Sequence, residues 1–198
     1  VGEEVTVGDG AGVWLTGVVA ASAPKRVAVT VTGRTVTQTP TPRLVLAQAL
    51  AKGDRDELAI QAATELGVAG VIPWAAERSV TRWEGAKVAR NEQRWRTIVR
   101  EASKQAIRSR VPEVASLTTT GQLMQLPGLL IVLEPTAGAP LTAVDLDGAE
   151  RVTLVVGPEG GIAPRELERF ADAGAVLARL GAEVLRTSTA GPAALAVL

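Results

Sequence analysis

The stretch that most constrains the fold is VVGPEGGIAP, which runs from Val155 to Pro164. It joins an apolar run, Val152 to Val156, to a segment from Pro164 to Ala173 that has proline in its first turn. We interpret these parts as a buried strand, a loop and a helix. The glycines of such a loop let a ligand approach the backbone and leave amide groups free to donate. The alternative is an ordinary strand–helix turn, and the stretch matches neither a Walker phosphate loop nor G-x-G-x-x-G.

A second loop of this kind follows the predicted strand Val176 to Leu180. Its sequence is LGAEVLRTSTA, from Leu180 to Ala190, in which an apolar pair precedes Arg186 and three hydroxyl side chains. The alternative is that Ser188 or Thr189 only caps the next helix. We predict that this helix runs from Ala190 to Leu198, with an early interruption at Gly191-Pro192.

The chain before these loops alternates between short apolar runs and helical patterns. A helix is predicted from Asp54 to Leu66, with Asp54 as N-cap and Gly67 just past its end. Short buried strands separated by helices predict an α/β fold with a parallel sheet covered on both faces. Ligands bind such sheets beyond the carboxyl ends of the strands, here the loops after Leu133, Val156 and Leu180. The remaining predicted strands are Leu44 to Leu50, Val68 to Pro73 and Leu129 to Leu133.

The first 38 residues have a different pattern, with alternating β-branched residues punctuated by glycine turns. The stretch Thr39-Pro40-Thr41-Pro42 follows, and two prolines in four residues are typical of an interdomain linker. We therefore predict a β-rich domain over residues 1–40 and an α/β domain over residues 44–198.

Composition excludes several kinds of chemistry. The chain has neither cysteine nor histidine, which rules out a thiolate nucleophile, a disulfide framework and a Cys/His zinc site. We expect no metal, so that catalysis depends on carboxylates, cations, hydroxyls, backbone amides or an organic cofactor. No apolar run has the roughly 18–20 residues of a membrane span, and no secretory signal is visible. We expect a cytoplasmic protein.

Positive charge is concentrated between Arg78 and Arg110, where ten basic residues meet three acidic ones, although the whole chain has a net charge of zero. Part of this window has helical spacing and is predicted to end at Val111-Pro112. Such a basic face is typical of contact with a polyanion such as RNA, and the alternative is a solvated face. One i, i+4 row of this helix would hold Arg96, Arg100, Lys104 and Arg108.

The motifs and their order resemble the bacterial 16S rRNA uridine-N3 methyltransferase family, of the SPOUT superfamily. The resemblance covers about residues 44–198 and depends on five ordered segments. One position departs from the family: Ser188 stands where a glutamate is usual, which puts any role for a carboxylate there in doubt. The five segments are Glu65-Leu66-Gly67-Val68, Pro73 with Glu77-Arg78-Ser79, Glu101 to Arg108 leading to Pro112, Gly157 to Gly161, and Leu180 to Ala190.

The resemblance implies the fold, the cofactor and the partners. It implies a C-terminal trefoil knot in the α/β domain and a small N-terminal PUA-like β-barrel, of which residues 1–40 would be an incomplete part. It further implies S-adenosylmethionine (SAM) as cofactor, a homodimer, and methylation of uridine N3 in 16S rRNA of the small ribosomal subunit. The alternatives are a SPOUT methyltransferase for another RNA site, a non-catalytic RNA-binding or ribosome-assembly protein, and a nucleotide-dependent α/β enzyme, which the missing phosphate-loop lysine disfavours.

The resemblance also implies site residues. Arg186 is the expected catalytic cation, which would stabilise the anion that develops on the uracil, and the alternative is a phosphate or dimer contact. Glu134 and Glu159 remain open as general bases, and the absence of cysteine closes a covalent C5-methylation route. The expected SAM-binding residues are Leu133, Glu134, Gly157, Pro158, Glu159, Gly160, Gly161, Leu180, Gly181, Val184, Leu185, Arg186 and Thr187. The expected RNA-binding residues are Arg78, Arg96, Arg100, Lys104, Gln105 and Arg108.

Overall fold

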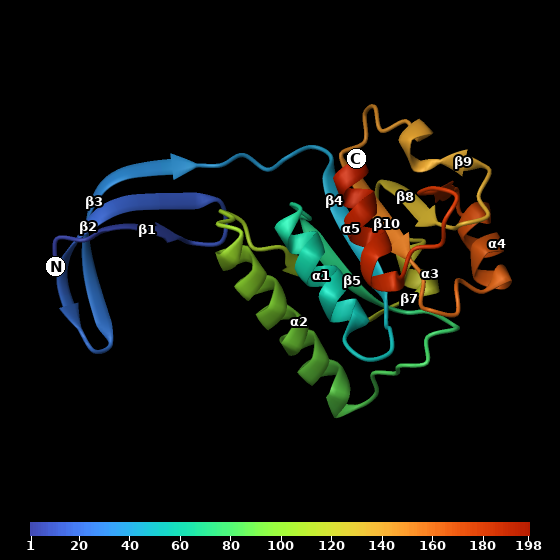
Figure 1. Ribbon diagram of the computed structural model, residues 1–198, viewed down its shortest axis with the longest axis horizontal. Coiled ribbons are helices and arrows are strands. Elements are labelled where there is room, and N and C mark those ends of the chain that lie inside the picture. The colour runs from blue at the N-terminus through green and yellow to red at the C-terminus, as the bar shows by residue number, and fades with distance from the viewer.

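The computed structural model describes all 198 residues, which form two sheets of opposite kinds (Figure 1). The first is a three-stranded antiparallel sheet, here called the N-terminal sheet. The second is an eight-stranded sheet that, together with its helices, forms the α/β unit, residues 43–198. The N-terminal sheet contains β1 (Glu4–Gly8), β2 (Val13–Ala23) and β3 (Arg26–Val36).

Every strand pair of the α/β unit is parallel, as predicted. The strand order is β6-β5-β4-β10-β8-β11-β9, with β7 also paired to β5. The strands are β4 (Arg43–Ala49), β5 (Gly70–Ala75), β6 (Glu113–Val114), β7 (Thr118–Thr119), β8 (Leu129–Leu133), β9 (Ala139–Pro140), β10 (Arg151–Val156) and β11 (Val176–Arg179). The helices are α1 (Arg55–Glu65), α2 (Ala86–Gln105), α3 (Thr120–Leu123), the short η1 (Leu141–Ala143), α4 (Pro164–Asp172) and α5 (Thr187–Val197).

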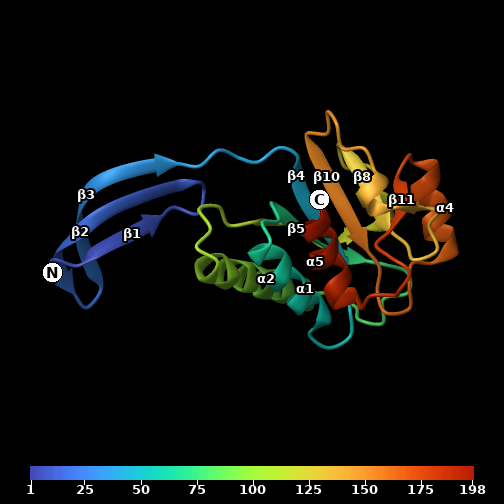
Figure 2. The same cartoon turned by 45° about the horizontal axis from the view of Figure 1, so that its top comes forward.

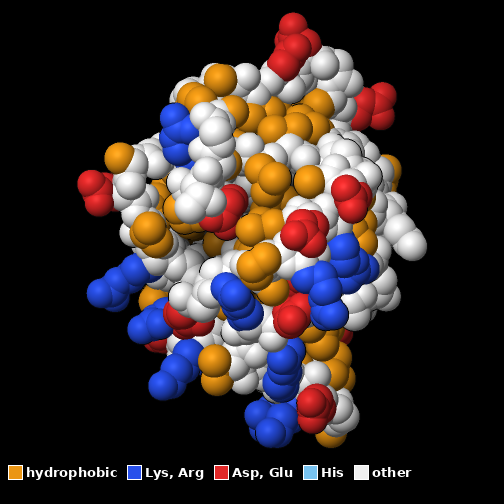
Figure 3. Space-filling view, turned by 90° about the vertical axis from the view of Figure 1, so that its right-hand side faces the viewer, with side chains coloured by type: hydrophobic (Ala, Val, Ile, Leu, Met, Phe, Trp, Pro, Cys, Tyr) orange, Lys and Arg blue, Asp and Glu red, His pale blue; other side chains and the backbone are white.

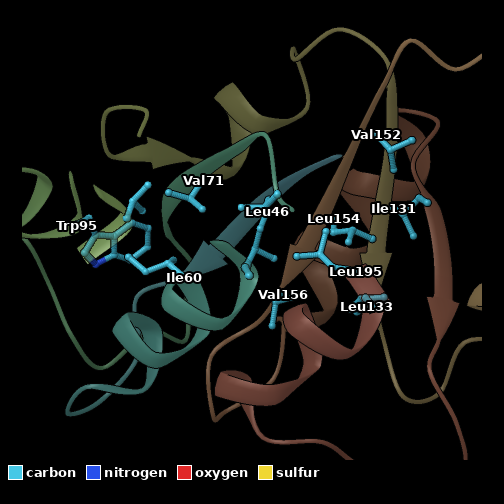
Figure 4. Packing of buried hydrophobic residues seen from close by; sticks show 14 of the residues in the cluster. Leu46, Ile60, Val71, Trp95, Ile131, Leu133, Val152, Leu154, Val156 and Leu195 are labelled. Carbon is cyan, nitrogen blue, oxygen red and sulfur yellow. The ribbon is translucent and has the colours of Figure 1, made fainter. Parts of the chain in front are cut away.

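Both faces of the parallel sheet are covered, because side chains alternate along its central strands. Leu46 of β4 lies in one buried cluster with Ile60 of α1 and Leu195 of α5, as Figure 4 shows. Val45, its neighbour, belongs to a second cluster that contains Phe170 of α4. The predicted two-faced α/β architecture is therefore confirmed.

The N-terminal sheet is open and has little core. β2 is the middle strand, and no pairing closes β1 onto β3, so these residues do not form a barrel. Val19 is the only hydrophobic residue before the linker that is buried, whereas Val27, Val31 and Val36 are each more than half exposed. The sheet stands apart from the α/β unit in two views and approaches it near the end of α2 (Figures 1 and 2).

Two predicted helix boundaries are wrong. The basic helix ends at Gln105 instead of reaching Val111, because Ile107 adopts a left-handed conformation with φ of 52°. The last helix begins at Thr187, three residues earlier than predicted, and runs through Gly191 and Pro192. A Cβ at Gly191 would lie 2.9 Å from Leu46 Cδ1, so glycine lets α5 pack tightly on β4 and tertiary packing outweighs the weak helix propensity.

The start of α1 also differs in detail from the prediction. Asp54 occupies the N-cap position, but its side chain makes no capping hydrogen bond. The carboxylate of Asp56 is buried instead and accepts from the backbone amides of Glu57 at 2.9 Å and Ala51 at 3.4 Å. Gly67, with φ of 95°, follows the helix as predicted.

Candidate functional site

A cavity of about 420 Å³ lies beyond the carboxyl ends of β8, β10 and β11. The three loops that the sequence predicted meet around it, although they are far apart in the chain. Every predicted SAM-binding residue except Gly160 lines this cavity. The six lining residues that were not predicted are Arg55, Pro135, Val156, Ile162, Glu183 and Ala190.

Arg55 is the least obvious of the missed residues, because it comes from the first turn of α1. Its signal was present in the sequence, since β4 is also a parallel strand and the loop after it ends at the same edge of the sheet. Ile162 has a simpler explanation: it packs back onto its own loop, residues 157–163 between β10 and α4, here called the glycine loop. A Cβ at Gly157 would lie 2.7 Å from Ile162 Cγ1, so only glycine fits there.

Glu159 braces the glycine loop. Its Oε1 accepts from Lys52 N at 3.0 Å and pairs with the guanidinium of Arg55 at 2.8 Å, so the loop is tied to the start of α1. Partial burial acts to raise the pKa of Glu159, but hydrogen bonds from its own amide, Lys52 and Arg55 outweigh burial, and its pKa lies below the usual value. A carboxylate held ionised in this way is suited to bracing the loop and poorly suited to accepting a proton.

Thr187 links the loop after β11 to the glycine loop through a buried chain of hydrogen bonds. Its hydroxyl donates to Gly157 O at 2.8 Å and accepts from Gln48 Nε2 at 2.8 Å. Gln48 is fully buried on β4 and could not be recognised from the sequence as part of the site. The start of α5 is therefore fixed against both β4 and the glycine loop.

Glu166 holds the other end of the glycine loop. This buried carboxylate accepts from the hydroxyl of Thr120 at 2.6 Å, from Glu77 N at 3.1 Å and from Ala163 N at 3.3 Å. The segment that follows Glu77 reaches the glycine loop directly, since Arg78 donates to Gly160 O at 3.1 Å. Gly160 thus faces Arg78 instead of the cavity, and Arg78 lies next to the pocket, away from the face of α2.

Arg186 lines the cavity just before α5, and its guanidinium makes no hydrogen bond or ion pair within the chain. The pocket therefore holds one cation that is free to act on a ligand. Glu134 also lines the cavity and accepts from the amide and hydroxyl of Thr136. Ser188, where the family usually has glutamate, lies in the first turn of α5 and does not line the cavity.

The basic helix is less free than its composition indicates. Arg96 lies 3.5 Å from Glu92 and Lys104 lies 2.7 Å from Glu101, whereas Arg100 and Gln105 are exposed and make no side-chain hydrogen bond. The prediction that Arg108 continues the row is wrong. Because the helix has already ended, its guanidinium turns back and donates to Thr64 O and Val68 O at 2.7 and 2.8 Å.

The rest of the surface adds little that is specific. No three His, Cys, Asp or Glu residues cluster closely enough to hold a metal ion. None of the helices is both long and apolar enough to cross a membrane.

Figure 3 views the end of the α/β unit that lies farthest from the N-terminal sheet. Hydrophobic side chains gather in the middle of this face, and most of its Lys and Arg side chains lie below them.

Comparison with known proteins gives consistent matches. Ribosomal RNA small subunit methyltransferase E of Mycobacterium bovis is 40% identical over 205 residues, which cover 98% of this chain and 77% of that protein. The Bacillus subtilis protein of the same name is 33% identical over 158 residues, 75% of this chain and 62% of the relative.

Two solved structures match over nearly the whole length of this chain. The methyltransferase E of Neisseria gonorrhoeae, bound to SAM, has a TM-score of 0.88 and 28% identity, covering 98% of this chain and 81% of that one. A Legionella pneumophila protein in complex with SAM has a TM-score of 0.88 and 30% identity, covering 99% and 82%. The family model described as an RNA methyltransferase domain matches residues 37–198, and the chain belongs to this family of RNA methyltransferases.

Proposed function

We propose that this protein transfers a methyl group from SAM to N3 of a uridine in 16S rRNA of the small ribosomal subunit. The observation that carries the proposal is the convergence of three distant loops on one cavity that holds an unpaired arginine. The relatives support the substrate class, since they are named ribosomal RNA small subunit methyltransferases. An rRNA substrate implies action in the cytoplasm.

The cavity has the features that SAM requires. Its volume of about 420 Å³ suits a ligand of this size, and its lining combines glycine backbone with aliphatic side chains. The adenosine would lie between the glycine loop, Leu133 and Leu180 to Leu185. Two related structures contain SAM. When bound, SAM supplies a methyl group already activated for transfer.

The protein then has three remaining tasks: orientation, charge stabilisation and removal of the N3 proton. Uridine N3 carries a proton at neutral pH, and its loss leaves negative charge on the uracil carbonyls. Arg186 would stabilise that charge, because its guanidinium has no competing partner within the chain. Glu134 is the better candidate for the proton acceptor, because Glu159 is committed to Arg55 and Lys52.

The finer architecture belongs to the same proposal. We propose that residues 44–198 form the SAM-binding domain and that residues 1–40 form part of a PUA-like RNA-binding domain. The segment from Leu180 to Arg186 leaves β11, passes over the ends of β8 and β10, and enters α5, which packs against α1 and β4. This crossing supports a C-terminal trefoil knot. The apolar patch in Figure 3 supports a homodimer.

The test is methyl transfer from labelled SAM to unmodified 16S rRNA and to small subunits that lack their modifications. The product nucleoside is identified by mass spectrometry, with Arg186→Ala assayed in parallel. N3-methyluridine is the expected product. A different methylated nucleoside would assign another RNA site, and SAM binding without methylation of either substrate would favour a non-catalytic role in RNA binding or ribosome assembly.

A further inference from the structure

The N-terminal sheet is joined to the α/β unit by a short segment, Arg108–Val111, here called the clasp. Gly12 N donates to Ser109 O at 2.9 Å, and Val111 N donates to Gly10 O at 2.9 Å. Ala11 and Arg110 thereby form an antiparallel bridge. The clasp therefore extends the strand pairing of the N-terminal sheet into the α/β unit.

The two arginines of the clasp anchor it to different parts of the molecule. Arg108 donates to the backbone at the end of α1, through Thr64 O and Val68 O. Arg110 donates to the N-terminal sheet and its linker, through Ala11 O and, at 2.8 Å, through Thr37 O. A Cβ at Gly12 would lie 2.5 Å from Arg110 Cζ, so glycine is required for this guanidinium to fit.

These directed bonds matter because the N-terminal sheet has almost no core to hold it in place. With Val19 as its only buried hydrophobic residue, its position relative to the α/β unit depends on the clasp and on the linker. In both ribbon views the sheet meets the rest of the molecule at this point and at the linker (Figures 1 and 2). Removing Arg110 should therefore loosen the sheet without unfolding the α/β unit.

A cleft of about 330 Å³ lies beside the clasp, between the linker and the α/β unit. Three arginines line it, Arg43, Arg108 and Arg110, against one acid, Glu113. Arg43 is exposed and its side chain has no partner within the chain, whereas Nε of Arg110 is buried and lacks an acceptor. A cleft with an excess of cations and an unsatisfied donor is suited to an anionic ligand.

We propose that this cleft binds backbone phosphate of the RNA substrate, with Arg43 as the contact residue and Arg110 as a positioning residue. The inference rests on the proposed function, under which the anionic ligand is an RNA that contacts both the N-terminal sheet and the α/β unit. Arg110 acts by holding the N-terminal sheet at a fixed distance from the α/β unit, so that RNA contacts both at once. The clasp thus sets RNA affinity and leaves the SAM pocket unchanged.

The test compares Arg43→Gln, Arg110→Ala and Arg110→Lys with a matched control, Arg90→Gln. Arg90 is exposed on α2, has no partner and does not line the cleft, so its loss removes the same charge. Each variant is assayed for kcat, for KM towards 16S rRNA, for SAM affinity and for RNA affinity across a salt series. Because the chain has no cysteine, Thr30→Cys and Thr97→Cys provide two unique spin-label sites that report the distance between β3 and α2.

For Arg43→Gln we expect KM for RNA to rise roughly 10-fold and the salt slope of binding to fall by about 0.7–0.9, the value for one lost phosphate contact. The values of kcat, SAM affinity and label distance should stay the same. For Arg110→Ala we expect a similar rise in KM together with a broadened distance distribution. Arg110→Lys should recover part of both, since it can still donate to one carbonyl.

Two results would overturn the inference. The first is an Arg43→Gln variant that binds RNA as the Arg90→Gln control does. The second is an Arg110→Ala variant with a broadened distance distribution and an unchanged KM. If the wild-type protein does not methylate 16S rRNA, the proposed function fails, but RNA affinity and its salt slope still decide the cleft: a reduced slope in Arg43→Gln supports it, and an unchanged slope or no RNA binding refutes it.

Discussion

The SAM pocket and the junction with the N-terminal sheet are built from different kinds of interaction. Around the pocket, loops are fixed by hydrogen bonds of buried groups such as Gln48, Thr187 and Glu166, and two hydrophobic clusters pack the sheet and helices behind them. At the junction, a sheet with a single buried valine is held by hydrogen bonds from the backbone and from Arg110.

This difference predicts two kinds of variant. A change in the pocket should alter chemistry or stability, because buried groups have no substitute partner when one is removed. A change at the junction should alter RNA binding or local strain and leave SAM binding unaffected.

Arg186→Ala should lower kcat for methyl transfer at least ~100-fold, the scale of losing one donor that stabilises developing charge. SAM affinity should remain within a few-fold of wild type, because the glycine loop and the aliphatic lining remain. The measurements are turnover with labelled SAM and calorimetric titration of SAM. Arg165→Ala is the control, since Arg165 is an exposed partner of Glu77 outside the cavity. Unchanged turnover would remove Arg186 from the mechanism.

Thr187→Val should lower the free energy of unfolding by about 1–3 kcal/mol, because Gln48 Nε2 loses a buried partner and Gly157 O loses a donor. SAM should bind more weakly, since the two loops are no longer tied together. Thr189→Val provides a matched control, because Thr189 is exposed and its side chain makes no hydrogen bond. Both variants are compared by urea denaturation and SAM titration. Equal stability and equal SAM affinity in the two variants would show that the hydrogen bonds of Thr187 are dispensable.

The fold was largely predictable because its elements are local. Apolar runs of strand length and the helical pattern after Asp54 placed β4, α1, β8 and β10 nearly correctly, and the parallel-sheet rule brought three loops to one edge. The contacts that finish the site join residues far apart in sequence. Neither the hydrogen bond from Thr187 to Gly157 nor the ion pair between Arg55 and Glu159 has a periodic signal in the sequence. Arg108 does not continue the predicted row of basic residues, because the helix ends before it.

Asp56→Asn should stabilise the protein at neutral pH and lose this advantage in acid. Burial raises the pKa of Asp56 to about 6, despite hydrogen bonds from the amides of Ala51 and Glu57. The folded state therefore holds this proton more tightly than the unfolded chain, and wild-type stability falls as pH rises from about 4 to about 6. Asparagine avoids that cost, so its advantage should be about 1–3 kcal/mol at pH 8 and vanish near pH 4.

The measurement for Asp56 is the free energy of unfolding by urea at several pH values. Asp54→Asn serves as control, because Asp54 is exposed two residues earlier in the chain and makes no capping bond. A pH-independent difference between wild type and Asp56→Asn would show that the carboxylate is not the source. Asp56 accepts from Ala51 N, next to the Lys52 amide that donates to Glu159, so this experiment also tests whether the start of α1 beside the pocket carries a cost in stability.

Ile107→Gly should give the smallest effect, a gain of about 1 kcal/mol in the free energy of unfolding, at the entrance to the clasp. Ile107 has φ of 52°, and a β-branched residue is strained there, whereas glycine is not. The turn itself is retained, because Ile107 N donates to Lys104 O and Arg108 N donates to Ser103 O, as in a Schellman cap. The side chain is 77% exposed, so little burial is lost.

Ile107→Ala removes the same side chain and keeps most of the strain, so a glycine variant no more stable than the alanine variant would contradict the prediction. SAM affinity should be equal in all three proteins, because relief of strain at the junction does not reach the buried bonds that hold the pocket.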